Sequence, residues 1–508
     1  MKNWLKLCTV AGCAMFMAAC VSDKSVDGRG SGDYKAEITS FGFYAEDNAG
    51  VLVLDYEGEI TGRDIVVALP ESVDKTQLKA RFTVSDGDIV SVGDEIFESG
   101  STVYDYSSPV DMLVSDSESK YAQVFSVNIT KPVNKVWTHV GTLKAEENEF
   151  TRSDFKMKLN PVDQLPYLVY CVTETASDED KLAFAKWDGS EFVRIGEEAF
   201  STEVGGAVDL EFDTKGTPFV LYADRGASVS NAPTVMTYDG SAWKVVGTSG
   251  FIPYAVNTSH GALAVDATGR IVVVTTGNGR NTEYYRLATL SSYSGSGWTS
   301  GVIPNRPTTY TSTYYQKARR FGESVYIGVA NVGTGGFYSL YKWTNGSVST
   351  LVESGLTNSS ATNWNDLAID FADDGTMYFL SSQQVDGAYL FQVYTYKDGE
   401  DSAPRPFGAS VPTTRFGAHT MALDRDGVPY IVYTLGSSGA RYLQVVSYDR
   451  EQRKWLDPVT VDVDNEIASE GLFIAFDDEN VGYLGAMGYV KPYEFRLYKL
   501  LEVESDTE

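Results

Sequence analysis

The sequence predicts an all-β protein, in which an N-terminal Ig-like β-sandwich precedes a seven-bladed β-propeller that is closed by an N-terminal strand. Three observations predict this fold. Short apolar and β-branched segments alternate with Gly, Asp and Asn turns, and no helical period is convincing. From Lys135 onward the pattern repeats about every fifty residues, which suits four strands and their turns per blade. A lone fourth strand at 136–142 opens the repeats, and the last repeat lacks its fourth strand.

Composition limits the classes of protein and partner. At 508 residues the chain is long enough for two folded units and a leader. Its hydrophobic share of 43% and charged share of 22% are typical of a soluble globular protein. The net charge of −28 argues against a nucleic-acid partner, since the densest basic group, Lys317, Arg319 and Arg320, is too small to hold a phosphate backbone. We expect a monomer with a solvated acidic surface.

Residues 1–19 have the pattern of a secretory signal peptide. Lys2 and Lys6 form a positive start, and the apolar run that follows them is too short to span a bilayer. The ending Met17-Ala18-Ala19-Cys20 resembles a bacterial lipobox. This resemblance implies that Cys20 is lipidated and that two or three acyl chains attach the protein to a membrane. Residues 20–32 are small, polar and glycine-rich, as in a flexible tether.

Residues 33–132 contain seven or more short predicted strands within about 100 residues, a density typical of an Ig-like sandwich. The predicted strands are 37–45, 51–56, 59–67, 78–84, 102–104, 110–114 and 122–129. The segment from Ser99 to Val110 and the extended run after it resemble Ig-like modules near the start of Bacteroidetes surface lipoproteins. That resemblance implies a spacer domain and an outer-membrane lipoprotein, displayed at the cell surface or facing the periplasm.

Residues 135–502 carry the propeller prediction. First strands are expected to start near 155, 208, 262, 317, 367, 420 and 472. Fourth strands are expected at 136–142, 192–196, 243–247, 298–302, 348–352, 404–408 and 455–459. The two counts agree only when 136–142 is included, which predicts that this strand completes the sheet left unfinished at the C-terminus. Closing the ring in this way removes sheet edges that would otherwise pair with other chains.

Acidic turns that end in Gly separate the first and second strands, as in Asp266-Ala267-Thr268-Gly269. Asp and Gly at these places are expected to cap tight hairpins. The Trp187-Asp188 pair occurs once and lacks a Gly-His partner, so the repeats are not those of WD40 proteins. They lack the paired glycines of kelch repeats and the full Asp-box of sialidases. The repeats resemble the divergent propellers of Bacteroidetes lipoproteins.

No catalytic, metal or cofactor motif stands out in the sequence. The chain has only three His, and none of them forms a metal-ligand pair at helical or CxxC-type spacing. There is no glycine-rich phosphate loop and no Gly-x-Ser-x-Gly elbow. We therefore predict no cofactor, no metal and no catalytic residue. The single cysteine between 21 and 508, Cys171, lies in an apolar run and is expected to be a buried, inert thiol.

Loops on one face of the predicted disc carry aromatic and polar residues, the side chains that a sugar site needs. The face is the one where a fourth strand leads into the next first strand. The candidate ligand-binding residues are Tyr254, His260, Tyr314, Tyr315, Gln316, Trp364, Asn365, Asp366, Arg415, His419 and Glu470. Five of them, His260, Gln316, Asp366, His419 and Glu470, take nearly equivalent places in their repeats, so they are expected to surround one channel mouth. The competing interpretation is that the aromatic rings pack between blades.

The favoured function is that of a lipid-anchored envelope protein that captures a glycan or a protein and is not an enzyme. One alternative is a glycoside hydrolase or polysaccharide lyase that uses carboxylates at the channel mouth, such as Asp366 and Glu470. Another alternative is a scaffold that binds envelope proteins and no small ligand.

Overall fold

The computed structural model describes most of the chain. The residues described are 36–52, 55–69, 73–115, 122–130, 134–144, 155–174, 177, 179–279, 283–303, 312–332, 337–357, 367–413, 417–437, 440–450, 452–463, 465, 467–488 and 493–503. Within them the protein is all-β apart from one 3₁₀ turn, Lys75–Gln77. The all-β prediction is therefore confirmed. The chain divides into two compact units, residues 1–132 and residues 133–508.

Unit 1 contains three sheets. The order β2-β1-β6 joins Tyr56–Glu57, Ile38–Phe43 and Arg81–Val84. The six-stranded order β3-β4-β11-β10-β7-β8 joins Glu59–Thr61, Asp64–Ala68, Ala122–Thr130, Val110–Ser115, Ile89–Val92 and Glu95–Phe97. The third sheet pairs β5 (Leu78–Lys79) with β9 (Val103–Tyr104). These sheets share one apolar core that includes Phe43, Val67 and Phe125, each at most 2% exposed.

Unit 2 is a series of four-stranded antiparallel sheets, most of them formed by four consecutive strands. The first three are β13–β16 (Phe155–Leu159, Pro166–Glu174, Glu179–Trp187, Phe192–Arg194), β17–β20 (Val204–Phe212, Pro218–Asp224, Ala232–Tyr238, Trp243–Val245) and β21–β24 (Val256–Val265, Ile271–Gly277, Ala288–Tyr293, Trp298–Val302). Next come β25–β28 (Ser312–Phe321, Ser324–Val332, Phe337–Thr344, Ser347–Thr357) and β29–β32 (Ala368–Phe371, Met377–Val385, Ala388–Tyr396, Arg405–Thr413). In the sheet β33–β36 (His419–Leu423, Pro429–Ser437, Ala440–Asp449, Lys454–Trp455), an additional strand β37 (Val459–Asp462) also pairs with β35.

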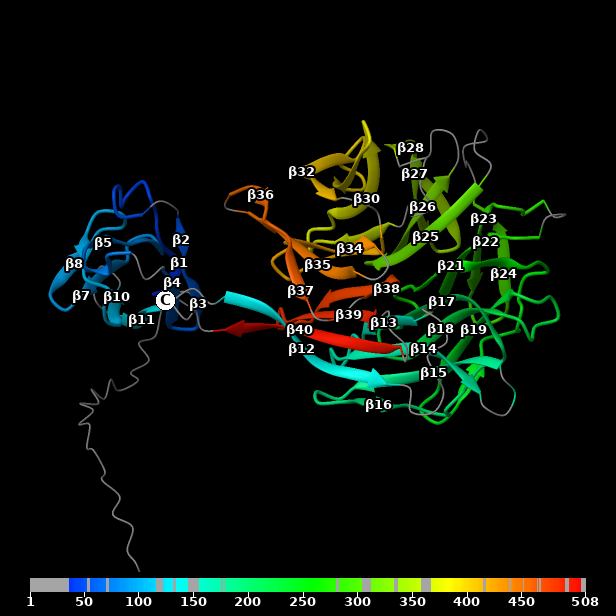
Figure 1. The fold of residues 1–508 in the computed structure, drawn as a ribbon. Coiled ribbons are helices and arrows are strands. Elements are labelled where there is room, and N and C mark those ends of the chain that lie inside the picture. The colour runs from blue at the N-terminus through cyan, green and yellow to red at the C-terminus, as the bar shows by residue number, and fades with distance from the viewer. Residues whose placement is uncertain are drawn as a thin grey trace, which may run out of the picture. The chain divides into compact units, whose positions relative to one another are not determined.

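The remaining sheet joins the two ends of unit 2. Its order is β12-β40-β39-β38, where β12 is Asn134–Lys144, β38 is Ile467–Phe476, β39 is Gly482–Gly488 and β40 is Glu494–Val503. Trp137 pairs with Leu500 and Thr138 with Lys499, so the first strand of the unit lies beside the last (Figure 1). The predicted pairing of 136–142 with the C-terminal segment is confirmed.

The first strands of these sheets contact one another in a closed series. Strand β13 contacts β17, and the contacts continue through β21, β25, β29 and β33 to β38, which in turn contacts β13. Buried apolar clusters fill the spaces between neighbouring sheets, for example Val169 and Phe184 of one sheet against Leu210 and Val220 of the next. Four-stranded sheets connected in this way form a β-propeller.

Candidate functional site

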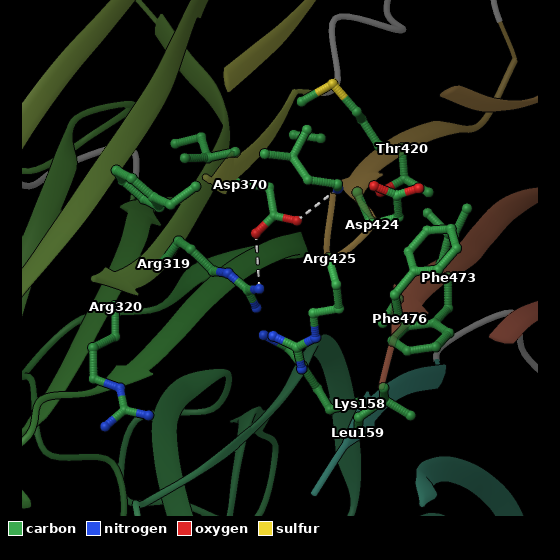
Figure 2. Close-up of a pocket in the computed structure, with 18 of the residues that line it drawn as sticks. Lys158, Leu159, Arg319, Arg320, Asp370, Thr420, Asp424, Arg425, Phe473 and Phe476 are labelled. Atoms are coloured by element: carbon green, nitrogen blue, oxygen red, sulfur yellow. Dashed lines mark hydrogen bonds and ion pairs between the residues drawn. The ribbon is translucent and has the colours of Figure 1, made fainter. Parts of the chain in front are cut away.

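A cavity of about 710 Å³ lies at the end of the first strands where they turn into the second strands. Strands β13, β17, β25, β29, β33 and β38 line it together with the hairpin turns that follow several of them, including Asp373-Asp374 and Asp424–Gly427. Figure 2 shows Arg319 and Arg425 extending toward the same space, with Arg320 to one side. Because six different sheets contribute to it, the cavity exists only when unit 2 is assembled.

Strand register brings equivalent positions of the sheets to this cavity. In each sheet one first-strand residue pairs with an aromatic residue, or with Val272, near the start of the second strand. These residues, called the ring residues below, are Lys158, Glu211, Ala264, Arg319, Asp370, Ala422 and Ala475. All of them except Ala264 line the cavity. Four sheets thus supply charged side chains at this level, and three supply alanine.

The four charged ring residues form two ion pairs between neighbouring sheets. Lys158 Nζ lies 2.9 Å from Glu211 Oε2, and Arg319 Nη2 lies 2.8 Å from Asp370 Oδ1. Asp370 also accepts a hydrogen bond from the backbone N–H of Leu423 at 2.9 Å, as Figure 2 shows. Coulomb attraction to the Asp370 carboxylate, with a further contribution from Glu211, raises the pKa of Arg319. Arg319 therefore stays charged and joins both carboxylates in one electrostatic network.

Three further arginines line the cavity, namely Arg320, Arg425 and Arg450. Arg425 donates from Nε to the carbonyl of Asp477 at 2.8 Å and forms an ion pair with Asp478. The side chain of Arg320 makes no hydrogen bond or ion pair with any residue in the described ranges. The guanidinium group of Arg425 is therefore fixed by the hairpin 477–480, whereas that of Arg320 has no partner among the residues described.

The carboxylates of the hairpin turns are bound to backbone N–H groups. Asp266 Oδ1 accepts from Thr268 and Arg270, at 2.8 and 2.9 Å, and Asp213 Oδ1 accepts from Lys215 and Thr217, both at 2.9 Å. These bonds confirm the hairpin-capping interpretation of such aspartates. In the cavity, Asp424 accepts from the N–H of Val428 at 2.8 Å, and burial raises the pKa of its carboxyl group.

Some predicted site residues do come together, but away from this cavity. Gln316 donates to the carbonyl of His260 at 2.8 Å, and the rings of His260 and Tyr315 lie 4.0 Å apart between β21 and β25. Tyr254 donates to Thr289 Oγ1 at 2.9 Å and stacks on Tyr284. Tyr254, Tyr315 and Gln316 are each at most 4% exposed. None of these residues lines the cavity.

His419 and Gln316 take equivalent register positions. His419 pairs with Tyr433, three residues after Tyr430, and Gln316 pairs with Val329, three residues after Tyr326. The two side chains are each 2% exposed, and His419 Nδ1 lies 2.9 Å from the carbonyl of Gly417. The other candidates, Trp364, Asn365, Asp366 and Arg415, and the side chains of Tyr314 and Glu470, lie outside the described part of the structure, as does Cys20. Ligand contact by the whole candidate set stays a prediction.

The sequence prediction missed the ring residues, although a signal for them exists. Lys158, Glu211, Arg319 and Asp370 recur at intervals close to one or two fifty-residue periods, so aligning the repeats by their second-strand aromatic residues places them at one level. In the sequence, Arg319 and Arg320 stand out only as part of a basic group, with Lys317, that is too small to bind nucleic acid.

Two features are absent from the described ranges, a metal-binding cluster and a membrane-spanning helix. These ranges contain no group of three or more His, Cys, Asp and Glu arranged to hold a metal ion. No helix among them has the length and hydropathy needed to cross a bilayer. Cys171 is a buried thiol with no exposed surface.

Comparisons with known proteins yield only distant likeness. No protein-family model matches the sequence, and no characterised protein matches it either. Similar solved structures include the Dos1 propeller (11% identity, 71% of this chain and 95% of that chain, TM-score 0.43) and the polysaccharide lyase Uly1 (8%, 73% and 98%, TM-score 0.41). The NanB sialidase of Streptococcus pneumoniae is 11% identical over 91% of this chain and 92% of its own, with a TM-score of 0.38. Because these TM-scores are below 0.5, the propeller assignment depends on the sheet order and strand contacts of this chain.

Proposed function

We propose that the protein is a non-catalytic, lipid-anchored binding protein of the bacterial cell envelope, whose propeller captures a glycan. In this proposal Cys20 carries the lipid in the outer membrane, residues 33–132 form an Ig-like spacer, and the seven sheets of residues 135–502 form a closed ring of blades. The observation that carries the proposal is the cavity of about 710 Å³ lined by paired carboxylate and guanidinium groups.

Planar charged groups are suited to sugars because each can bond two adjacent hydroxyl groups at once. Arg319 and Arg425 supply guanidinium donors, while Asp373 and Asp426 supply exposed carboxylate acceptors around the same cavity. The volume falls within the range of roughly 300–1,000 Å³ that is usual for small-ligand sites. A short oligosaccharide segment would fit such a space.

Binding without turnover is the better-supported activity because the buried carboxylates of the cavity are already bonded. Asp370 holds Arg319 and the N–H of Leu423, and Glu211 holds Lys158. A general acid needs a carboxyl group that is protonated near neutral pH and free to donate to the leaving oxygen. Both oxygens of Asp370 and both oxygens of Glu211 are already engaged, so these carboxyl groups fail the second requirement.

The hydrolase or lyase alternative has one specific observation in its favour, namely that burial raises the pKa of Asp424. A carboxyl group with a raised pKa is a candidate general acid. However, Asp424 Oδ1 accepts from Val428 N–H in the same way as the corresponding aspartates of other hairpins. Its position is therefore explained by the turn that it caps.

A glycan array probed with the chain lacking residues 1–32 tests the proposal, with product release followed on every glycan that binds. Binding without products supports the proposal, and release of shortened products would establish the enzyme alternative. If no glycan binds, the proposal fails, and a protein captured from envelope extract would instead support the scaffold alternative.

The array also locates the site, because the cavity and the face predicted from the sequence have different candidate residues. Loss of binding in Arg319→Gln with binding kept in Trp364→Ala places the ligand in the cavity. The reverse result, with an unchanged melting temperature, places it on the face predicted from the sequence.

A further inference from the structure

In the two ring ion pairs the cation is more exposed than its carboxylate partner. The Arg319 side chain is 43% exposed against 12% for Asp370, and the Lys158 side chain is 23% exposed against 15% for Glu211. Each carboxylate is therefore held farther from solvent, and the positive group is the more accessible member of the pair. The pairs present positive charge to the cavity even though each pair is neutral.

The hydrogen-bonding capacity left over on these groups is mainly that of donors. Asp370 uses one oxygen for Arg319 and the other for the N–H of Leu423. Glu211 likewise uses Oε2 for Lys158 and Oε1 for the N–H of Phe212. Arg319 has five N–H donors, and only the bond from Nη2 to Asp370 engages them within the described ranges.

The rim adds donors of the same kind. Arg425 uses Nε and Nη2 for the hairpin 477–480. The side chain of Arg320, which lines the cavity beside Arg319, has no hydrogen-bond or ion-pair partner among the residues described. The cavity lining as a whole has seven Lys and Arg against eight Asp and Glu, so the case for an anion is local to the unused guanidinium donors of Arg319 and Arg320. Guanidinium groups bind carboxylate and sulfate oxygens by paired, charge-assisted hydrogen bonds.

We propose that the cavity selects an acidic glycan, and that Arg319 and Arg320, which line it from opposite faces of β25, bind oxyanions on its sugars, either uronic acid carboxylates or sulfate esters. This inference rests on the proposed glycan-binding function and specifies its ligand class. Lys158 and Arg425 line the same cavity. Asp370 and Glu211 fix Arg319 and Lys158, respectively, through their ion pairs.

Calorimetric titration of the chain lacking residues 1–32 tests this selectivity with three probes of equal length. The probes are an oligogalacturonate, a sulfated galactan oligosaccharide and a neutral galactan oligosaccharide. We expect an acidic probe to bind at least about tenfold more tightly than the neutral one, as charge-assisted bonds to an arginine imply. The carboxylate and sulfate probes distinguish the two sources of the anion. Affinity for the acidic probe should fall as salt is raised.

Arg320→Gln is the decisive variant because the loss of Arg320 leaves no partner unpaired within the described residues. It should weaken acidic-glycan binding about tenfold or more and leave the melting temperature unchanged. Lys244→Gln is the matched control, since it removes one positive charge from the outer strand β20, where Lys244 pairs with Asp239. It should leave binding unchanged.

The ring pair itself separates a binding role from a structural one. If Arg319 only joins two sheets, Arg319→Gln and Asp370→Asn should have similar effects on binding. If Arg319 binds the anion, Arg319→Gln should weaken acidic-glycan binding, whereas Asp370→Asn should keep or strengthen it. Equal binding of neutral and acidic probes, or unchanged binding by Arg320→Gln, would overturn this inference and leave the proposed function standing. Failure of all glycans to bind would overturn both.

Discussion

Glycine and tryptophan form a recurring contact between neighbouring sheets. A Cβ added to Gly196 would lie 3.0 Å from Trp243 Nε1, and one added to Gly247 would lie 3.0 Å from Trp298 Nε1. The same contact recurs at Gly408 and Trp455, where the distance is 3.1 Å. Trp298 donates to the carbonyl of Val246, next to the glycine. The tryptophans that mark fourth strands in the sequence therefore serve the packing of one sheet on the next.

Gly247→Ala should destabilise the protein by more than its backbone conformation alone explains. Gly247 has a φ of +70°, which costs a residue with a Cβ about 1–2 kcal/mol, and its new methyl group would also meet Tyr293 at 2.9 Å. Such overpacking typically costs about 1–3 kcal/mol more. Urea denaturation measures the total.

Gly295→Ala is the control for this comparison, because Gly295 also has a positive φ, +92°, but an added Cβ would have no heavy atom within 4 Å. It should show the conformational cost alone. Equal losses of stability in the two variants would mean that the tryptophan contact adds nothing.

At the scale of the strand, the closing element β12 is held by its pairing with β40 and by one large buried side chain. Trp137 is 8% exposed and packs in a core with Phe476 and Leu500. A Cβ on Gly482 would lie 2.9 Å from its ring, so the indole fits closely against β39. Both contacts join the start of unit 2 to its end.

Trp137→Ala should cost about 3–5 kcal/mol of unfolding free energy, because it leaves a large cavity between β12 and the last sheet. Val136→Ala, one residue earlier and 46% exposed, should change stability by less than about 1 kcal/mol. Chemical denaturation and amide hydrogen exchange in β40 measure the two effects. Full protection of β40 in Trp137→Ala would show that the closing strand does not depend on this side chain.

The strands of unit 2 could be predicted from the sequence because each hairpin carries its own signal. Asp and Gly at the turns, and Trp or Phe at several fourth strands, locate β16, β20 and β24 to within two residues. The starts of β21 and β38 were placed several residues too late. In both strands a register shift, between Val256 and Gly261 and between Ile467 and Leu472, admits polar residues that interrupt the apolar pattern. Bulges of this kind have no sequence period.

Unit 1 was predicted less completely. Strands β7 and β8, Ile89–Val92 and Glu95–Phe97, were missed because three or four residues are too few to show alternation. The predicted strand 59–67 is two strands, separated by a turn at Gly62 and Arg63. The alternation pattern that predicts the longer strands therefore does not detect a two-residue turn between two short strands.

For the whole molecule, the site could be predicted less well than the fold. The cavity combines side chains from six sheets, and the two ion pairs of the ring residues join residues about fifty positions apart, Lys158 with Glu211 and Arg319 with Asp370. The fifty-residue period predicts the four-stranded sheets. Which residues of different sheets lie at the same height of the cavity depends on strand register, which the period does not determine. The candidates Gln316 and His419, predicted from the segments that lead into the first strands, are instead buried at the opposite end of those strands.

The same register places a buried tyrosine at one position of several sheets. Burial of these phenols is expected to make the free energy of unfolding fall at high pH. Tyr430 and Tyr483 are equivalent second-strand residues, and burial raises the pKa of each to about 12. Burial also raises the pKa of Tyr326 and Tyr378 at the same position. A raised folded-state pKa favours the neutral phenol. Its contribution to stability is thus complete below the unfolded pKa of about 10 and is lost as the pH rises toward 12.

We expect the urea midpoint to be steady up to about pH 10 and to fall between about pH 10 and 12. Ultraviolet titration should show a group of tyrosines that ionise late, and Tyr430→Phe should remove one of them. If all tyrosines titrate near pH 10 while the native circular dichroism is retained, these phenols are not shielded as the structure implies.

The pairing of β12 with β40 also determines when the molecule can be completed. The ribosome makes β12 before any other strand of unit 2 and β40 after all of them. During synthesis the edge of β12 that later binds β40 has no partner, and the intervening sheets must form before the ring can shut. The last strand of unit 2 to emerge is thus the one whose pairing completes the sheet that β12 begins.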